Sequence, residues 1–371
     1  MTVCCLLPSF SISASEDTNK LNLDCKSAVL MEASTGEVLY EYNPDEPLPP
    51  ASVTKVMTLL LVMEAIDGGK LSLSDKIQVS ENAASMGGSQ VFLEPGETMS
   101  VEDLLKSVVI ASANDAAVAL GEHISGSEEG FIARMNERAK ELDMKNTNFE
   151  NATGLDDNTS NHLTSARDIA IMSRELMKHE TILDYTTIWM DTIRDGAFGL
   201  TNTNRLIRFY NGANGLKTGS TSKARFCISA AAKRDNMQLI AVVMGSPTRD
   251  IRNECAKKML DYGFANYSIA QIEEGTVGDL KLLGGIKNSF STVYPSVSML
   301  VGKGQNKNIE THINVNESYS APIKAGEKVG EIVYTLNGNE IGKVDITSAE
   351  SVEKIGYWGL FVNMVKKYLL I

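Results

Sequence analysis

The sequence predicts an α/β domain, in which helices flank an antiparallel sheet and a helical insert interrupts it, followed by a small β-sandwich and a terminal amphipathic helix. Strand-like apolar segments at 28–40 and 226–244 lie on either side of a helix-rich stretch at about 71–176. Helical periodicity ends near 267–275, and short strands separated by turns follow it. The last twenty residues return to helical spacing.

These changes of pattern divide the chain into four segments. We expect the α/β domain at 21–268, the β-sandwich at 269–350 and the amphipathic helix at 351–371. Residues 1–20 are predicted to be the remnant of a secretory signal, because an apolar run is followed there by small residues suited to cleavage. No basic residues precede that run, so we expect the start of the signal to lie upstream; an uncleaved strand is the alternative.

The first motif is Ser52-Val53-Thr54-Lys55, which follows two prolines and leads into the apolar run 56–63. Proline favours the start of a helix, so Ser52 is predicted near a helix N-terminus. A spacing of three residues then places Ser52 and Lys55 on one face, where an amine can take the hydroxyl proton. The N–H groups at a helix start have no internal partners, so that of Ser52 is available to an oxyanion.

Lys55 can act as a base only when it is neutral, and an ordinary lysine, with a pKa of about 10.4, is almost entirely charged at neutral pH. The all-apolar helix that follows predicts burial, which lowers the pKa of an amine. A second cation in the same cleft, Lys217, would lower the pKa of Lys55 further. The alternative is that Ser52 caps the helix and Lys55 is solvated.

The second motif, Ser112-Ala113-Asn114, separates two apolar helical runs. Ser100 and Asp103 form a capping signature at the start of the first of these helices. A hydroxyl and an amide on a rigid turn between helices can relay a proton and hold a substrate amide. Taken alone, the same residue types are more often structural, because serine and asparagine are common in turns.

The third motif, Lys217-Thr218-Gly219, is predicted to lie on an edge strand beside the cleft. Such a strand can pair with an extended peptide, and Lys217 and Thr218 can bind its carboxylate. Gly219 permits close approach, and the N–H of Ser220 can complete an oxyanion hole. Taken alone, such a motif is far more often a strand end with a surface lysine.

The three motifs in this order indicate a serine acyl-transfer site. With them the chain resembles the penicillin-recognising serine peptidases, and within these the D-alanyl-D-alanine carboxypeptidases among the low-molecular-mass penicillin-binding proteins. The resemblance covers about 25–346 and implies a β-lactamase/transpeptidase-like catalytic domain. It extends to framework segments at 28–40, 161–170 with His162, 201–204 and 261–265.

The resemblance implies a role for each matching residue. Ser52 is the acylated nucleophile and Lys55 its base, while Ser112 and Asn114 assist proton transfer and hold the substrate amide. Lys217 and Thr218 hold the terminal carboxylate of the substrate. Arg252 matches the position of a second cation that binds the same carboxylate. The nearby Arg249 could exchange roles with Arg252.

Two positions depart from the family pattern. Ala113 stands where many members have glycine, a change that the backbone can tolerate. Ser220 stands where a histidine or an aromatic residue is frequent, which leaves side-chain contacts there in question but not the N–H. A glutamate that would activate water, as in class A β-lactamases, has no clear equivalent, although Asp156 and Asp157 lie in a loop.

The implied activity is removal of the terminal D-Ala from peptidoglycan pentapeptides through an acyl-enzyme on Ser52. The partners would be stem peptides ending in D-Ala-D-Ala and β-lactams as covalent inhibitors. Three alternatives remain open: a DD-endopeptidase, a β-lactamase, and an inactive penicillin-binding scaffold. Labelled penicillin and a D-Ala-D-Ala peptide would distinguish them.

Composition excludes several other classes of protein. A net charge of -12 argues against a nucleic-acid partner, because a phosphate backbone would repel the chain. The four histidines are scattered without metal-ligand spacing, and we expect neither a metal nor a cofactor. The five cysteines do not form a disulfide framework, and Cys227 is expected to be buried in a strand.

The C-terminal segments carry no predicted chemistry. Asn337-Gly338 predicts a hairpin within the β-sandwich, which in the resembling family lifts the cleft above the membrane. After it, Trp358 and its apolar neighbours recur at helical spacing beside Lys354, Lys366 and Lys367. The uncharged run is too short to cross a bilayer, so we expect the helix to lie on the outer face of the cytoplasmic membrane. A helix docked on the β-sandwich is the alternative.

Overall fold

The computed structural model describes residues 19–157 and 159–369, so that nearly all of the predicted signal remnant at 1–20 lies outside the described residues. The described chain divides into two compact units between Asn266 and Tyr267. Helix α9 ends at Asn266 and strand β10 begins at the next residue, so no linker separates the units. The predicted boundary lies two residues further on.

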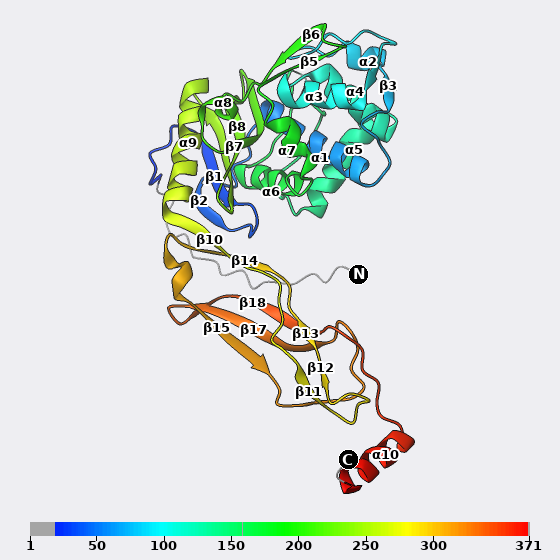
Figure 1. The fold of residues 1–371 in the computed structure, drawn as a ribbon. Helices are drawn as coiled ribbons and strands as arrows, with labels where there is room; N and C mark the ends of the chain where they lie inside the picture. Colours follow the sequence, from blue (N-terminus) through cyan, green and yellow to red (C-terminus); the bar gives the residue numbers. More distant parts are fainter. Residues whose placement is uncertain (1–18, 158, 370–371) are drawn as a thin grey trace. The chain divides into compact units, whose positions relative to one another are not determined.

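The first unit is built on an antiparallel sheet with the strand order β2-β1-β9-β8-β7 (Figure 1). Strand β9 lies at its centre and is almost entirely buried, which accounts for its continuous apolar sequence. Strand β7, which carries the Lys217 motif, is an edge strand as predicted. The strands are β1 (Ser27–Glu32), β2 (Val38–Tyr42), β7 (Ala213–Thr221), β8 (Arg225–Arg234) and β9 (Met237–Ser246).

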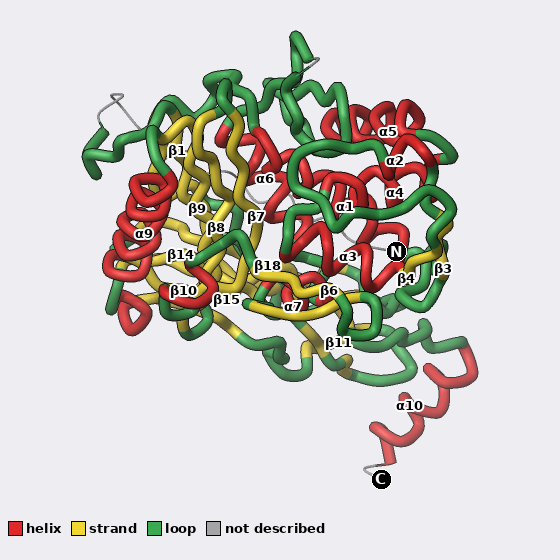
Figure 2. Tube along the Cα trace, turned by 90° about the horizontal axis from the view of Figure 1, so that it is seen from above, coloured by secondary structure: helices red, strands yellow, loops and turns green. Residues whose placement is uncertain are grey.

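Helices cover both faces of this sheet. Figure 2 shows α9 on one side of the strands and α6 on the other. The serines that precede α3, α5 and α6 each accept a hydrogen bond from the N–H three residues later, so local sequence fixes these helix starts. The helices are α1 (Lys55–Asp67), α2 (Glu81–Ala84), α3 (Val101–Ile110), α4 (Asn114–Ser125), α5 (Glu128–Glu141), α6 (Ala166–Leu176), α7 (Thr181–Thr186), α8 (Leu206–Phe209) and α9 (Arg249–Asn266).

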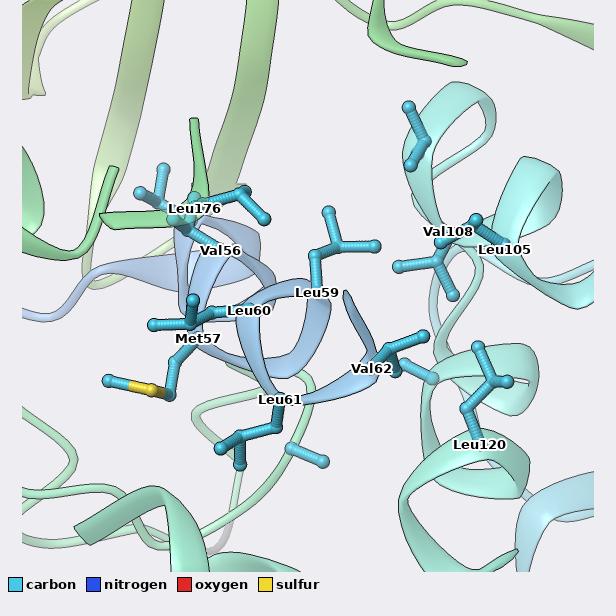
Figure 3. Packing of buried hydrophobic residues seen from close by; sticks show 14 of the residues in the cluster. Val56, Met57, Leu59, Leu60, Leu61, Val62, Leu105, Val108, Leu120 and Leu176 are labelled. Carbon is cyan, nitrogen blue, oxygen red and sulfur yellow. The ribbon is translucent and has the colours of Figure 1, made fainter. Parts of the chain in front are cut away.

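Helix α1 runs through the middle of the unit. Its side chains from Val56 to Met63 are buried on every side of the helix, because α3, α4 and α6 pack around it (Figure 3). The predicted helical insert at 71–176 ends too late, since α6 packs on the sheet itself. Two small two-stranded antiparallel sheets complete the unit: β3 (Lys76–Gln78) with β4 (Thr98–Ser100), and β5 (Met190–Ile193) with β6 (Phe198–Thr201).

The second unit consists of short strands around a separate apolar core that includes Leu282, Phe290 and Tyr334. Its largest sheet has the order β13-β18-β17-β15, and Asn337-Gly338 turns β17 into β18 as predicted. The strands are β10 (Tyr267–Ile272), β11 (Leu280–Leu283), β12 (Ser289–Phe290), β13 (Thr292–Val293), β14 (Val297–Gly302), β15 (Ile309–Val315), β16 (Tyr319–Ser320), β17 (Lys328–Leu336) and β18 (Asn339–Ser348).

The terminal helix α10 (Tyr357–Leu369) begins six residues later than the predicted start at 351. The reason is that Val352 pairs with Ile323 and Lys354 pairs with Gly285, which keeps this stretch in the β unit. With this change of boundary, the predicted fold class is confirmed: an α/β unit with an antiparallel sheet, a β unit and a terminal helix.

Candidate active site

Ser52 lies in a short 3-10 helix, η1 (Ala51–Thr54), which runs directly into α1, and Lys55 is the first residue of α1. The Nζ atom of Lys55 is 3.0 Å from Oγ of Ser52. Thr54, not Ser52, occupies the position before α1, and Lys55 is completely buried. The alternative of a capping serine beside a solvated lysine is therefore wrong.

Lys55 has two further partners in this buried setting. Its Nζ donates to Oδ1 of Asn114 at 2.5 Å and to the backbone oxygen of Thr153 at 2.8 Å. A neutral amine has two N–H groups and one lone pair. The two carbonyl oxygens accept the two N–H groups, so the lone pair of a neutral Lys55 is left for the hydroxyl of Ser52.

The electrostatic surroundings favour this neutral form. Burial lowers the pKa of Lys55 well below its usual value, and the charge of Lys217 lowers it further, whereas Asp115 acts in the opposite direction. Burial and the neighbouring Arg252 likewise lower the pKa of Lys217 to about 7. Both effects on Lys55 have the direction predicted from the sequence.

Ser112 lies in the turn between α3 and α4, as predicted, and Asn114 follows that turn directly. Ser112 is buried and has a left-handed φ of 64°. Asn114 is the first residue of α4, and its Nδ2 donates to the backbone oxygen of Gly87 at 2.7 Å, which turns Oδ1 toward Lys55. Ala113 has an ordinary φ of -60°, so a side chain in place of glycine causes no strain there.

The Lys217 motif lies on β7 beside the nucleophile. Lys217 is buried, and its Nζ donates to the backbone oxygen of Thr218 at 3.0 Å. The hydroxyl of Thr218 donates to that of Thr203 at 2.8 Å. Ser220, the next residue after the motif, is exposed.

Gly219 brings β7 against the backbone at Ser52. A Cβ atom at Gly219 would lie 2.8 Å from the nitrogen of Ser52 and 2.9 Å from both the oxygen of Pro50 and the nitrogen of Val53. Any side chain would therefore push the strand away from the nucleophile, so glycine is required here for close approach.

Arg252 and Arg249 differ in position. Arg252 lies on α9, is buried, and donates to the backbone oxygen of Cys227 and to Oδ1 of Asn253. Its charge contributes to the lowered pKa of Lys217. Arg249 is exposed. The geometry thus favours Arg252 over Arg249 beside Lys217.

Sequence reasoning missed the support beneath the nucleophile. Gly154, with φ 84°, lies so close to Ala51 that a Cβ would be 1.8 Å from the Ala51 oxygen. His162 accepts a hydrogen bond at Nδ1 from the N–H of Glu150, so Nε2 carries its proton and donates to the Thr54 hydroxyl at 2.8 Å. The sequence offered His162 only as part of a framework segment, without a partner.

The three sequence motifs, at η1, at the start of α4 and on β7, therefore converge on Ser52. Comparison with known proteins also identifies a serine peptidase. The model of the D-alanyl-D-alanine carboxypeptidase family matches residues 13–248, and that of the penicillin-binding protein 5 C-terminal domain matches residues 272–354. The chain belongs to the D-alanyl-D-alanine carboxypeptidase family. It is a serine-type carboxypeptidase of peptidoglycan, and the comparisons favour none of the alternative functions.

Individual relatives of this carboxypeptidase match it over most of its length. D-alanyl-D-alanine carboxypeptidase DacF of Bacillus subtilis is 45% identical over 357 residues, covering 94% of this chain and 91% of that protein. Penicillin-binding protein 5 from Haemophilus influenzae has a TM-score of 0.78 at 32% identity, covering 90% of this chain and 98% of the other. Penicillin-binding protein D2 from Listeria monocytogenes, solved in an ampicillin-bound form, has a TM-score of 0.60 at 33% identity, covering 66% and 99%.

Proposed function

We propose that this carboxypeptidase works through an acyl-enzyme on Ser52, with Lys55 as the general base. The observation that carries the proposal is the arrangement of partners around Lys55. Two carbonyl oxygens accept hydrogen bonds from the two N–H groups of the neutral amine. Its lone pair is left for the Ser52 hydroxyl, whose oxygen lies 3.0 Å from Nζ. A lowered pKa keeps the amine available as a proton acceptor.

Acylation begins when Oγ of Ser52 attacks the carbonyl carbon of the penultimate D-Ala and its proton passes to Nζ of Lys55. The N–H groups of Ser52 and Ser220 would stabilise the oxyanion, and the close approach of β7 to Ser52 at Gly219 supports this role. Collapse of this intermediate breaks the C–N bond. The departing D-Ala nitrogen takes the proton from Lys55, and Ser112 is the group that can relay it.

The substrate would lie along β7 and be held by its C-terminus. An edge strand offers unpaired backbone groups to an extended peptide, which explains why the motif lies on β7. Lys217 and Thr218 would bind the terminal carboxylate, and Arg252 adds a second positive charge. This local charge is needed because the chain as a whole is negative.

Water then hydrolyses the ester on Ser52 and restores the free enzyme. A β-lactam would acylate Ser52 by the same attack, but its opened ring stays attached to the acyl group. We therefore expect β-lactams to act as covalent inhibitors.

We also propose that α10 attaches the enzyme to the outer face of the cytoplasmic membrane. Within residues 19–157 and 159–369, no helix combines the length and the apolar character that crossing a bilayer requires. Helix α10 instead exposes Trp358, Phe361 and Met364, which suits an interfacial helix and argues against docking on the β unit. The side chains of Lys366 and Lys367, part of the predicted anchor, lie outside the described residues.

The deciding experiment treats the wild type and Ser52→Ala separately with two reagents, labelled penicillin and the peptide diacetyl-Lys-D-Ala-D-Ala. The wild type should gain one covalent label and release free D-Ala, and Ser52→Ala should do neither. Rapid loss of the label would indicate a β-lactamase, and stem peptides released from cross-linked dimers with little free D-Ala would indicate an endopeptidase. A labelled Ser52→Ala protein would overturn the assignment of the nucleophile.

A further inference from the structure

Two cysteines far apart in sequence lie together at the edge of the catalytic unit. Cys25 stands two residues before β1, and Cys255 lies on α9, one turn after Arg252. The Sγ atom of Cys255 is 3.8 Å from the backbone oxygen of Asp24, the residue before Cys25. The two thiols lie near enough for each to shift the pKa of the other.

The backbone around this pair is held in place. The Lys26 N–H donates to the oxygen of Met244, and the Ser246 hydroxyl donates to that of Asp24. Cys25 is partly exposed, whereas Cys255 is only 3% exposed. A reagent in solution can therefore reach the thiol of Cys25, whereas the thiol of Cys255 is shielded from solvent.

The environment of the pair also favours thiol chemistry. The hydrogen bond from Cys25 lowers the pKa of Cys255 to about 7, and Lys258 contributes in the same direction. The remaining described cysteine is different: burial raises the pKa of Cys227 to about 11. Cys255 in turn raises the pKa of Cys25, so Cys255 carries the thiolate of the pair.

We propose that Cys25 and Cys255 form a reversible disulfide that fastens the segment before β1 to α9. The spacing of the cysteines along the chain predicts no such bond, because only the folded sheet brings the two thiols together. The bond would persist outside the cytoplasm, a location that rests on the proposed function.

The reaction requires an oxidant, which would be a disulfide, either of an extracytoplasmic thiol oxidase or of a small thiol. Cys25 attacks one sulfur of that disulfide while its proton passes to the neighbouring Cys255 thiolate, and a thiolate is expelled, giving a mixed disulfide on Cys25. Cys255, deprotonated again, then attacks the Cys25 sulfur, forms the internal bond and expels the second thiolate. The two protons lost from the cysteines end on the two thiols released.

Such a bond would act mainly on stability. It would close a loop containing most of the catalytic unit, and long closed loops restrict the unfolded chain most. It would also fasten α9 one turn from Arg252. Oxidation should therefore raise the melting temperature of the full chain by about 3 °C or more.

The test uses the purified full chain incubated under native conditions with oxidised glutathione, then alkylated and digested with trypsin. Peptides 21–26 and 253–257 should appear as one disulfide-linked pair, and dithiothreitol should separate them. Cys25→Ser and Cys255→Ser should lose both the linked pair and the rise in melting temperature. The matched control, Cys227→Ser, should keep both.

Two results would overturn the proposal. One is recovery of both peptides separately alkylated, or with glutathione left on Cys25. The other is a disulfide joining Cys227 to either residue. Because peptide mass is the readout, the answer does not depend on whether Ser52 is the nucleophile.

Discussion

At the residue scale, the site depends on two buried lysines with different tasks. Lys55 must be neutral to accept a proton, whereas Lys217 must be charged to bind a carboxylate. The surroundings of each lysine favour the protonation state that its task requires. Two carbonyl oxygens and the charge of Lys217 surround Lys55, while Lys217 has a pKa of about 7 and becomes neutral only above it.

This difference predicts how the activity depends on pH. The charged form of Lys217 binds the substrate carboxylate, so kcat/KM should fall above about pH 7, by up to tenfold per pH unit. The bound carboxylate raises the pKa of Lys217, so kcat should fall less than kcat/KM. Hydrolysis of the D-Ala-D-Ala peptide from pH 6 to 9 measures this. A peptide with a C-terminal amide is the control and should lack the fall; a flat profile for the acid would contradict the prediction.

His162 makes a second prediction at this scale, for stability. Burial lowers the pKa of His162 to about 4, below the value of about 6.5 for an unfolded histidine. The unfolded chain therefore takes up the proton first, so stability is full above about pH 6.5 and is lost as pH falls toward 4. From pH 7 to 5 this amounts to about 2 kcal/mol.

Urea unfolding at pH 7 and pH 5 measures that loss. His162→Gln keeps a polar group near Thr54 but cannot titrate, so its free energy of unfolding should change less between the two pH values. An equal pH-dependent loss in wild type and variant would show that other groups cause it.

At the scale of elements, the close approach of β7 to the 3-10 helix decides the geometry. Gly219→Ala would place a Cβ 2.8 Å from the nitrogen of Ser52 and force the two elements apart. A displacement of this kind should slow acylation by about 100-fold and cost on the order of 1–3 kcal/mol of stability. Labelling with a fluorescent penicillin and thermal unfolding measure the two effects.

Gly199→Ala is the control for that substitution. Gly199 lies on β6, and apart from its own chain neighbours no heavy atom lies within 4 Å of its added Cβ. The control should acylate at the wild-type rate. Normal acylation of Gly219→Ala would mean that β7 need not touch the nucleophile.

These elements also show which parts of the site and fold could be predicted from the sequence alone. The three motifs are local in sequence, and their helix and strand positions follow from spacing, so η1, α4 and β7 were predictable. The support from Thr153 and Gly154 was not, because a backbone oxygen and a left-handed glycine leave no side-chain signature. The start of α10 was placed too early for a similar reason: the pairing of Val352 is a long-range contact.

At the scale of the whole molecule, chemistry and attachment are separated along the chain. Every residue of the proposed site lies between Ser52 and Arg252, and the β unit contributes none of them. Attachment must also overcome charge, since a chain with a net charge of -12 is repelled by anionic lipids. Apolar contact through α10 is therefore the expected source of membrane affinity.

A truncation after Gly356 tests this expectation without disturbing the β unit, because Val352 and Lys354 keep their strand pairing. The full chain should sediment with phospholipid vesicles, and the truncated chain should remain in the supernatant with an unchanged rate on the soluble peptide. High salt should not release the full chain, because burial of Trp358 and Phe361 does not depend on ionic screening. Equal sedimentation of both forms would place the anchor outside α10.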